Sequence, residues 1–143
     1  MLGQFNKFGI RFAYPEDWAI VDEEDSQWPR RVSVQSPNSG YWELQVYPPD
    51  FRPADLSDQT LEAFREEYDD LDSERVHEEI MDHPTMGYDL DFFCMDLLVT
   101  CQVRSFTLGG QTLLLICQAE SREFETRREV FEAITRSLFR EAE

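Results

Sequence analysis

The chain has 143 residues, a formal net charge of −17, and 41% hydrophobic and 13% aromatic residues. The length fits one domain, residues 1–143, and the apolar content excludes a disordered chain. The acidic charge disfavours binding to nucleic acid phosphates or anionic lipid head groups, because like charges repel. It favours solubility, or a partner with a basic segment.

The cysteines and the N-terminus indicate the cellular location. Cys94, Cys101 and Cys117 are odd in number and lie in apolar runs, which fits free buried thiols in a reducing compartment. The first ten residues, MLGQFNKFGI, lack a basic region followed by an apolar one, so no secretory signal is visible. No stretch approaches 18 apolar residues. We therefore expect a cytoplasmic protein without membrane insertion.

The first predicted strands flank a Tyr-Pro corner. Apolar residues alternate from Ile10 to Tyr14, and Pro15 ends this strand because it cannot donate a ladder hydrogen bond. A second strand begins near Trp18 and runs into an acidic turn at 22–26. The corner is expected to be structural, with the Tyr14 and Trp18 rings sealing one end of the core.

Residues 30–47 form a predicted hairpin. Pairing Val34 with Trp42 and Val32 with Leu44 places the apolar side chains on one face and leaves 36–40 as the loop. The polar face then carries Arg31, Ser33, Gln35, Tyr41, Glu43 and Gln45.

Two helices are predicted, at 57–71 and 122–139. Asp55 or Ser57 caps the first, and Ser121 caps the second. The apolar stripe of the first helix is Leu61, Phe64, Tyr68 and Leu71. That of the second is Phe124, Phe131, Ile134 and Leu138, widened by Val130.

Four strands lie between the helices. Residues 75–81 are charged and predict an edge strand, and 86–94 alternate. Residues 97–107 and 111–119 form a hairpin across a two-residue Gly109-Gly110 turn, which pairs 103 with 116 and 102 with 117.

This last hairpin is apolar on both faces, which predicts central strands covered on both sides. The expected fold class is therefore α+β: an α/β/α sandwich with a central antiparallel sheet covered by helices on both faces.

The element order resembles the PsbP-like α/β/α sandwich superfamily. The residues that carry the resemblance are Phe12, Tyr14, Pro15, Trp18, Gly109, Gly110, Phe131, Ile134, Ser137 and Leu138. They are packing residues, so the resemblance implies a fold and transfers no site residue. The superfamily includes photosystem II extrinsic subunits, a Ran-binding import factor, bacterial proteins of mostly unknown role, and type VI secretion chaperones. The resemblance says little about activity by itself, and together with the missing catalytic sets it motivates a binding or chaperone-like role.

Four aromatic residues near the first hairpin form a candidate partner surface: Trp28, Tyr41, Tyr47 and Phe51. Exposed aromatic side chains are common in protein interfaces. Tyr41 and Tyr47 lie on the polar face, whereas Trp42 is expected in the core.

Two patterns, one of histidines and one of acidic residues, suggest metal sites, and each also has a simpler explanation. His77 and His83 would share a strand face with Glu79 unless a turn at Pro84 separates them, in which case they are edge-strand residues. Residues 70, 72 and 74 have the spacing of a calcium loop. Arg75 stands where that loop needs glycine, so a solvated acidic turn is favoured. No metal ligands are predicted.

Asp89 and Asp91 are the acids with the best case for burial, because they alternate with apolar residues, but a solvated face is the favoured interpretation. A hydrolase using them would need a concave pocket. Arg104, opposite Leu115, either reaches water at a strand end, pairs with a buried acid or faces a ligand.

No nucleophile signature and no glycine-rich phosphate loop occurs in the chain. We therefore predict a non-enzymatic protein-binding or chaperone-like module with no catalytic residue and no cofactor. Its partner is a protein with a basic or apolar segment, and the chain is a monomer or dimer. The alternatives are a small hydrolase-type enzyme using buried acids and a dimeric structural subunit.

Overall fold

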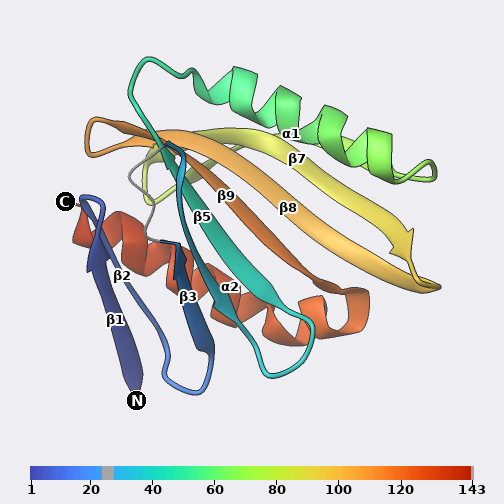
Figure 1. Ribbon diagram of the computed structural model, residues 1–143, viewed down its shortest axis with the longest axis horizontal. Helices are drawn as coiled ribbons and strands as arrows, with labels where there is room; N and C mark the ends of the chain where they lie inside the picture. The colour runs from blue at the N-terminus through green and yellow to red at the C-terminus, as the bar shows by residue number, and fades with distance from the viewer. Residues whose placement is uncertain (24–27, 143) are drawn as a thin grey trace.

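The computed structural model describes residues 1–23 and 28–142. The strands of its large antiparallel sheet are β3 (Ala19–Glu23), β4 (Arg30–Gln35), β5 (Tyr41–Tyr47), β6 (Asp72–Ile80), β7 (His83–Cys94), β8 (Leu97–Leu108) and β9 (Gln111–Glu120). Their order across the sheet is β3-β4-β5-β9-β8-β7-β6. Two helices, α1 (Pro53–Glu67) and α2 (Ser121–Glu141), and a separate hairpin, β1 (Leu2–Lys7) and β2 (Ile10–Pro15), complete the fold (Figure 1). Most of the predicted acidic turn at 22–26 lies outside the described residues.

The predicted registers are confirmed. Val34 pairs with Trp42 and Val32 with Leu44. Across the Gly109-Gly110 turn, Val103 pairs with Ile116 and Gln102 with Cys117. β5 alternates fully buried residues with half-buried ones, because only one of its faces is fully covered.

Two apolar clusters lie on opposite sides of the sheet. Trp42 belongs to one cluster, in which α2 and the β1–β2 hairpin pack against the sheet. The ring of Phe12 lies 4.7 Å from that of Trp42, and Ser137 of α2 accepts a hydrogen bond from the Ala13 amide at 2.9 Å. Trp18 is buried with its ring edge-on to Phe131, so the Tyr-Pro corner is part of this core.

The other cluster includes Leu56 and Leu61 of α1. The main contacts of α1 are with β7, β8 and β9, and Figure 1 shows it along β7 and β8, away from β3. The mixed α+β class, with a large antiparallel sheet and two helices, is confirmed. In the described chain, helix packing on the α1 side is concentrated over β7, β8 and β9.

Both helix starts differ from the prediction. α1 begins at Pro53, because proline fits the first helical position, where no amide donor is needed. Ser57 is therefore inside the helix, where its hydroxyl lies 2.5 Å from that of Ser105. α2 is capped by the Glu120 carboxylate, which accepts from the amides of Arg122 and Glu123, rather than by Ser121.

Strand β1 was not predicted from the sequence. Of its residues only Phe5 is buried, so the strand shows almost no apolar alternation. Its partner β2 is reached through a two-residue turn, Phe8-Gly9, in which both residues have positive φ.

Candidate functional site

The structure brings together only two of the four candidate aromatic residues. The rings of Tyr47 and Phe51 lie 5.1 Å apart on the α1 side of the sheet. Tyr41 is at the other end of β5, about 20 Å away at the usual strand rise. Trp28 packs 4.6 Å from the guanidinium of Arg30, which also reaches the ring of Phe8 and therefore lies on the α2 side.

A ladder of side chains runs along the half-buried face of β5. The Tyr47 hydroxyl donates to Gln45 Oε1, and Gln45 Nε2 donates to Glu43 Oε2, each at 2.8 Å. We call Glu43, Gln45, Tyr47 and Phe51 the β5 surface. It offers an aromatic pair and a carboxylate that are linked through Gln45. Tyr41 is set deeper, and burial, followed by the nearby Cys101 and Glu43, raises the pKa of its hydroxyl, so it remains a neutral donor.

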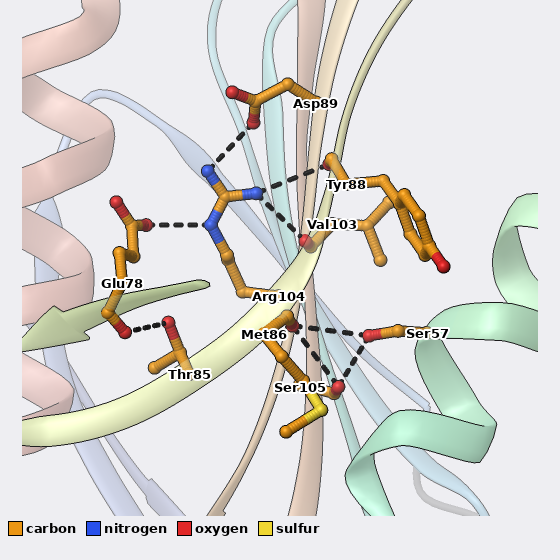
Figure 2. A network of polar contacts seen from close by, with 9 residues as sticks. All are labelled: Ser57, Glu78, Thr85, Met86, Tyr88, Asp89, Val103, Arg104 and Ser105. Carbon is orange, nitrogen blue, oxygen red and sulfur yellow. Dashed lines mark hydrogen bonds and ion pairs between the residues drawn. The ribbon is translucent and has the colours of Figure 1, made fainter. Parts of the chain in front are cut away.

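Arg104 is a buried cation with four hydrogen bonds (Figure 2). Nε donates to Glu78 at 2.7 Å, and Nη2 donates to Asp89 at 2.8 Å. Nη1 donates to the carbonyls of Val103 and Tyr88. Burial acts to lower the pKa of Arg104, but the bonds to Glu78 and Asp89 outweigh it and the pKa is raised. Arg104 therefore stays charged and links β6, β7 and β8 through its hydrogen bonds.

The backbone of β7 makes room for this tie. Gly87 pairs with Arg104 across the two strands, and a Cβ on Gly87 would collide with the carbonyl oxygen of Val103. That oxygen is one of the acceptors of Arg104. A residue without a side chain is therefore required for the close approach of the two backbones.

A cleft of about 440 Å³ lies between α2 and the strands beside Arg104. Asp89, Arg104, Cys117, Phe131 and Glu132 are among the residues that line it. The obvious reactive groups of the cleft are the Asp89 carboxylate and the Cys117 thiol, and neither is poised to react. The Asp89 carboxylate is held in the ion pair with Arg104, and burial raises the pKa of the Cys117 thiol to about 12 although Arg104 opposes the shift. A thiol of that kind is protonated and a poor nucleophile.

The other sequence candidates are dispersed. Asp91 is exposed and accepts a hydrogen bond from Thr100. His83 pairs with Ile80 across the turn, so His77, three residues before Ile80, faces the other side of the sheet. His83 packs against the ring of Phe139 at 5.0 Å. The turn after β6 thus separates the two histidines.

The calcium-like spacing falls mainly on a strand. Asp72 and Glu74 belong to β6 and pair with Asp91 and Asp89 of β7, so they do not form a loop. Within residues 1–23 and 28–142, no group of three or more His, Cys, Asp or Glu side chains could hold a metal ion.

Glu123 forms a polar site that the sequence did not reveal. Its carboxylate accepts from the Ser36 hydroxyl at 2.6 Å, from both the amide and the hydroxyl of Ser39 at 2.7 Å, and from the Gly40 amide at 3.2 Å. It ties the β4–β5 loop to the first turn of α2. Its partners are more than 80 residues away in the chain, so no local pattern signals the contact.

The solved structures that are similar to this chain show that its fold is PsbP-like. The chain is similar over 95% of its length to the solution structure of a cyanobacterial PsbP, CyanoP from Synechocystis, with a TM-score of 0.65, 12% identity and 90% of that chain covered.

Two further solved structures are similar. One is PA94 from Pseudomonas aeruginosa, a protein of unknown function described as a putative regulator, with a TM-score of 0.56 and 11% identity over 96% of this chain and 95% of that one. The other is LpqN, involved in cell envelope biogenesis in Mycobacterium tuberculosis, with a TM-score of 0.52 and 12% identity over 87% and 79%. No family model and no curated protein sequence matches the chain. At these identities the likeness shows the fold alone. Neither helix in the described residues is long and apolar enough to cross a bilayer.

Proposed function

We propose that this chain is a non-enzymatic protein-binding module and that the β5 surface contacts its partner. The observation that carries the proposal is the Tyr47–Phe51 pair, in which Phe51 is 42% exposed and Tyr47 half-buried, on a sheet face where α1 lies over other strands. Aromatic side chains of this kind supply much of the binding energy in protein interfaces. In this interpretation helices lie on both faces of the sheet. The partner binds the region of the α1-side face that α1 leaves uncovered.

The partner in this proposal carries a basic segment. The net charge of −17 would speed the approach of a cationic surface, and Glu43 is linked to Tyr47 through Gln45. We place the interaction in the cytoplasm, as the sequence predicts. The described roles of the similar structures, a putative regulator, a PsbP and a cell envelope protein, agree with a role other than catalysis.

The hydrolase alternative is less well supported. It needs a carboxyl group in a concave site that is free to take or give a proton. Asp89 lines the cleft but is committed to Arg104, and Asp91 is exposed.

Affinity capture with surface variants tests the proposal. The immobilised full chain is used to capture partners from source cells, and bound proteins are eluted with increasing salt. We expect the Tyr47→Ser, Phe51→Ser double variant to lose a partner that the wild type retains, and salt to release that partner. Trp28→Ser is the matched control, because Trp28 and Phe51 are similarly exposed, 44% and 42%, and Trp28 is on the other side of the sheet.

Equal capture by all three proteins would contradict the proposal, as would the absence of any specific partner. Light scattering on the same samples tests the dimeric alternative. A dimer that the double variant disrupts would mean that the β5 surface binds a second copy of the chain rather than a different protein.

A further inference from the structure

The hairpin of β7 and β8 extends beyond the rest of the sheet. The pairing of β6 with β7 stops where Asp72 meets Asp91, and the pairing of β9 with β8 stops where Glu120 meets Val99. Residues Phe93–Leu98, which we call the β7–β8 tip, therefore pair only with each other. Figure 1 shows this two-stranded ribbon reaching past the end of β9, where α2 begins.

The β7–β8 tip is apolar although it projects into solvent. Met95 at its apex is 92% exposed, and Phe93, Leu97 and Leu98 are 55%, 50% and 40% exposed. Phe93 pairs with Leu98 on one face of the ribbon, and Leu97 pairs with Cys94 on the other. Single exposed apolar residues are ordinary, but four within six residues, spread over both faces and the apex of a projecting ribbon, are a concentration of the kind that marks an interaction site.

The turn at the apex is unfavourable for its residues. Met95 and Asp96 have φ values of 52° and 66°, a two-residue hairpin turn that Asn-Gly or Gly-Gly would fill more easily. Methionine gains no packing there in return, because its side chain is exposed. Neither the conformation of the turn nor the burial of the side chain explains a methionine at this position.

Acidic groups lie at the apex of the tip and near its base. Asp96 is at the apex, and Asp91 and Asp72 face each other at the base. Asp69 follows Tyr68, whose ring stacks on Phe92 at 4.1 Å. Arg122, at the start of α2, is paired with Glu120. A complementary surface has an apolar pocket with a rim of arginine or lysine, and an anionic membrane would be repelled.

We propose that the β7–β8 tip is a docking element that inserts Met95 and its neighbours into an apolar, basic-rimmed pocket of a partner protein. This site is separate from the β5 surface and involves none of its residues. The two proposals can therefore fail independently.

Site-specific photo-cross-linking in source cells tests this inference. The photoreactive amino acid p-benzoyl-phenylalanine replaces Met95 in the full chain, and in a matched control it replaces Trp28. We expect position 95 to cross-link to a protein that position 28 does not reach, at a segment lining an apolar pocket with Arg or Lys at its edge. Adding Phe93→Ser and Leu98→Ser should lower the cross-link yield by about tenfold or more, the effect of losing one well-buried anchor.

Several results would overturn the inference. These are cross-links from position 95 only to lipid, only to a second copy of the chain, to a segment without basic residues, to the proteins that position 28 also reaches, or to nothing. A second variant guards against misfolding: Met95→Asn suits the positive φ of the turn, and its chain should compete with the cross-linking chain for the partner far less well than wild type. Equal competition by Met95→Asn would also contradict the docking role.

Discussion

Two hairpin turns in this molecule have the same two-residue sequence, Met-Asp, but differ in burial. Met81-Asp82 joins β6 to β7 with φ values of 49° and 68°, and Met95-Asp96 joins β7 to β8 with 52° and 66°. Met81 is half-buried against the core cluster on the α2 side, whereas Met95 is 92% exposed. The same local chemistry and backbone therefore lead to opposite environments.

The difference comes from what lies beside each turn. The β6–β7 turn lies near the end of α2, where Phe139 contacts His83 at 5.0 Å and Phe106 at 4.8 Å. The β7–β8 turn lies beyond the last paired residues of β6 and β9. Burial at a turn thus depends on whether a neighbouring element reaches it: α2 reaches the β6–β7 turn, whereas β6 and β9 end before the β7–β8 turn.

The largest effect is expected at the anchor of the β6–β7 turn. Phe139→Ala removes a fully buried ring and should lower the free energy of unfolding by about 3–5 kcal/mol. Leu97→Ala at the exposed tip should change it by less than about 0.5 kcal/mol. Urea unfolding measures both. Similar losses of unfolding free energy in the two variants would contradict the claim that the two turns differ in packing.

The next effect concerns Arg104, which ties β6 and β7 to the centre of the sheet. Arg104→Met keeps the apolar stem but loses all four hydrogen bonds, and should cost about 2–3 kcal/mol because the carboxylates it leaves are part-exposed and can turn to water. The control is Arg128→Met, whose pair with Glu125 is largely in solvent and should be worth under about 0.5 kcal/mol. Thermal or urea unfolding separates the two, and equal costs would show that Arg104 is not a special tie.

Replacing each of the two turn methionines, Met81 and Met95, with asparagine compares the packing of the two turns directly. Met81→Asn should lower the free energy of unfolding by about 1 kcal/mol, because lost apolar packing exceeds the relief of positive φ. Met95→Asn should raise it by about 0.5 kcal/mol, because only the relief remains. The two changes therefore have opposite signs in the same denaturation assay. The same sign for both would mean that the two turns do not differ in packing.

The smallest effect is a pH dependence at a third connection, the β4–β5 loop. Burial acts to raise the pKa of Glu123, but hydrogen bonds from Ser36, Ser39 and Gly40 outweigh it, so the pKa is lowered from its usual 4.5. The stability that these bonds add is present above pH 4.5 and is lost as the pH falls through the lowered value. Solvent screening keeps the gain below about 0.5 kcal/mol.

The measurement is the unfolding free energy of wild type and Glu123→Gln as a function of pH. We expect the difference between them to be constant near neutral pH and to shrink in acid. A difference that grows as the pH falls would contradict the assignment.

The parts of the fold that local patterns specify were predictable. Alternation fixed the pairing of Val34 with Trp42, and Gly109-Gly110 fixed that of Val103 with Ile116. The same alternation predicted that Leu97 belongs to a covered strand, which is wrong, because Leu97 is half-exposed. A pattern of period two assigns side chains to faces and says nothing about how far neighbouring strands extend.

The candidate site was predictable only in part. The sequence placed Tyr41 and Tyr47 correctly on the less buried face of β5 but could not show that Trp28 packs on Arg30 across the sheet. The pairing of Arg104 with an acid was one of three alternatives that the sequence left open, and its partner Glu78 is 26 residues distant, so that only the β6–β7 register brings it near. Contacts of this range depend on strand order, which local patterns do not encode.

The most direct test of the docking account is the stability of the chain carrying Phe93→Ser, Met95→Asn and Leu98→Ser together. If these side chains serve a partner and not the fold, the free energy of unfolding should equal that of wild type within about 0.5 kcal/mol, or exceed it. A loss of more than about 2 kcal/mol would mean that the apolar tip stabilises the isolated chain, which would contradict the account.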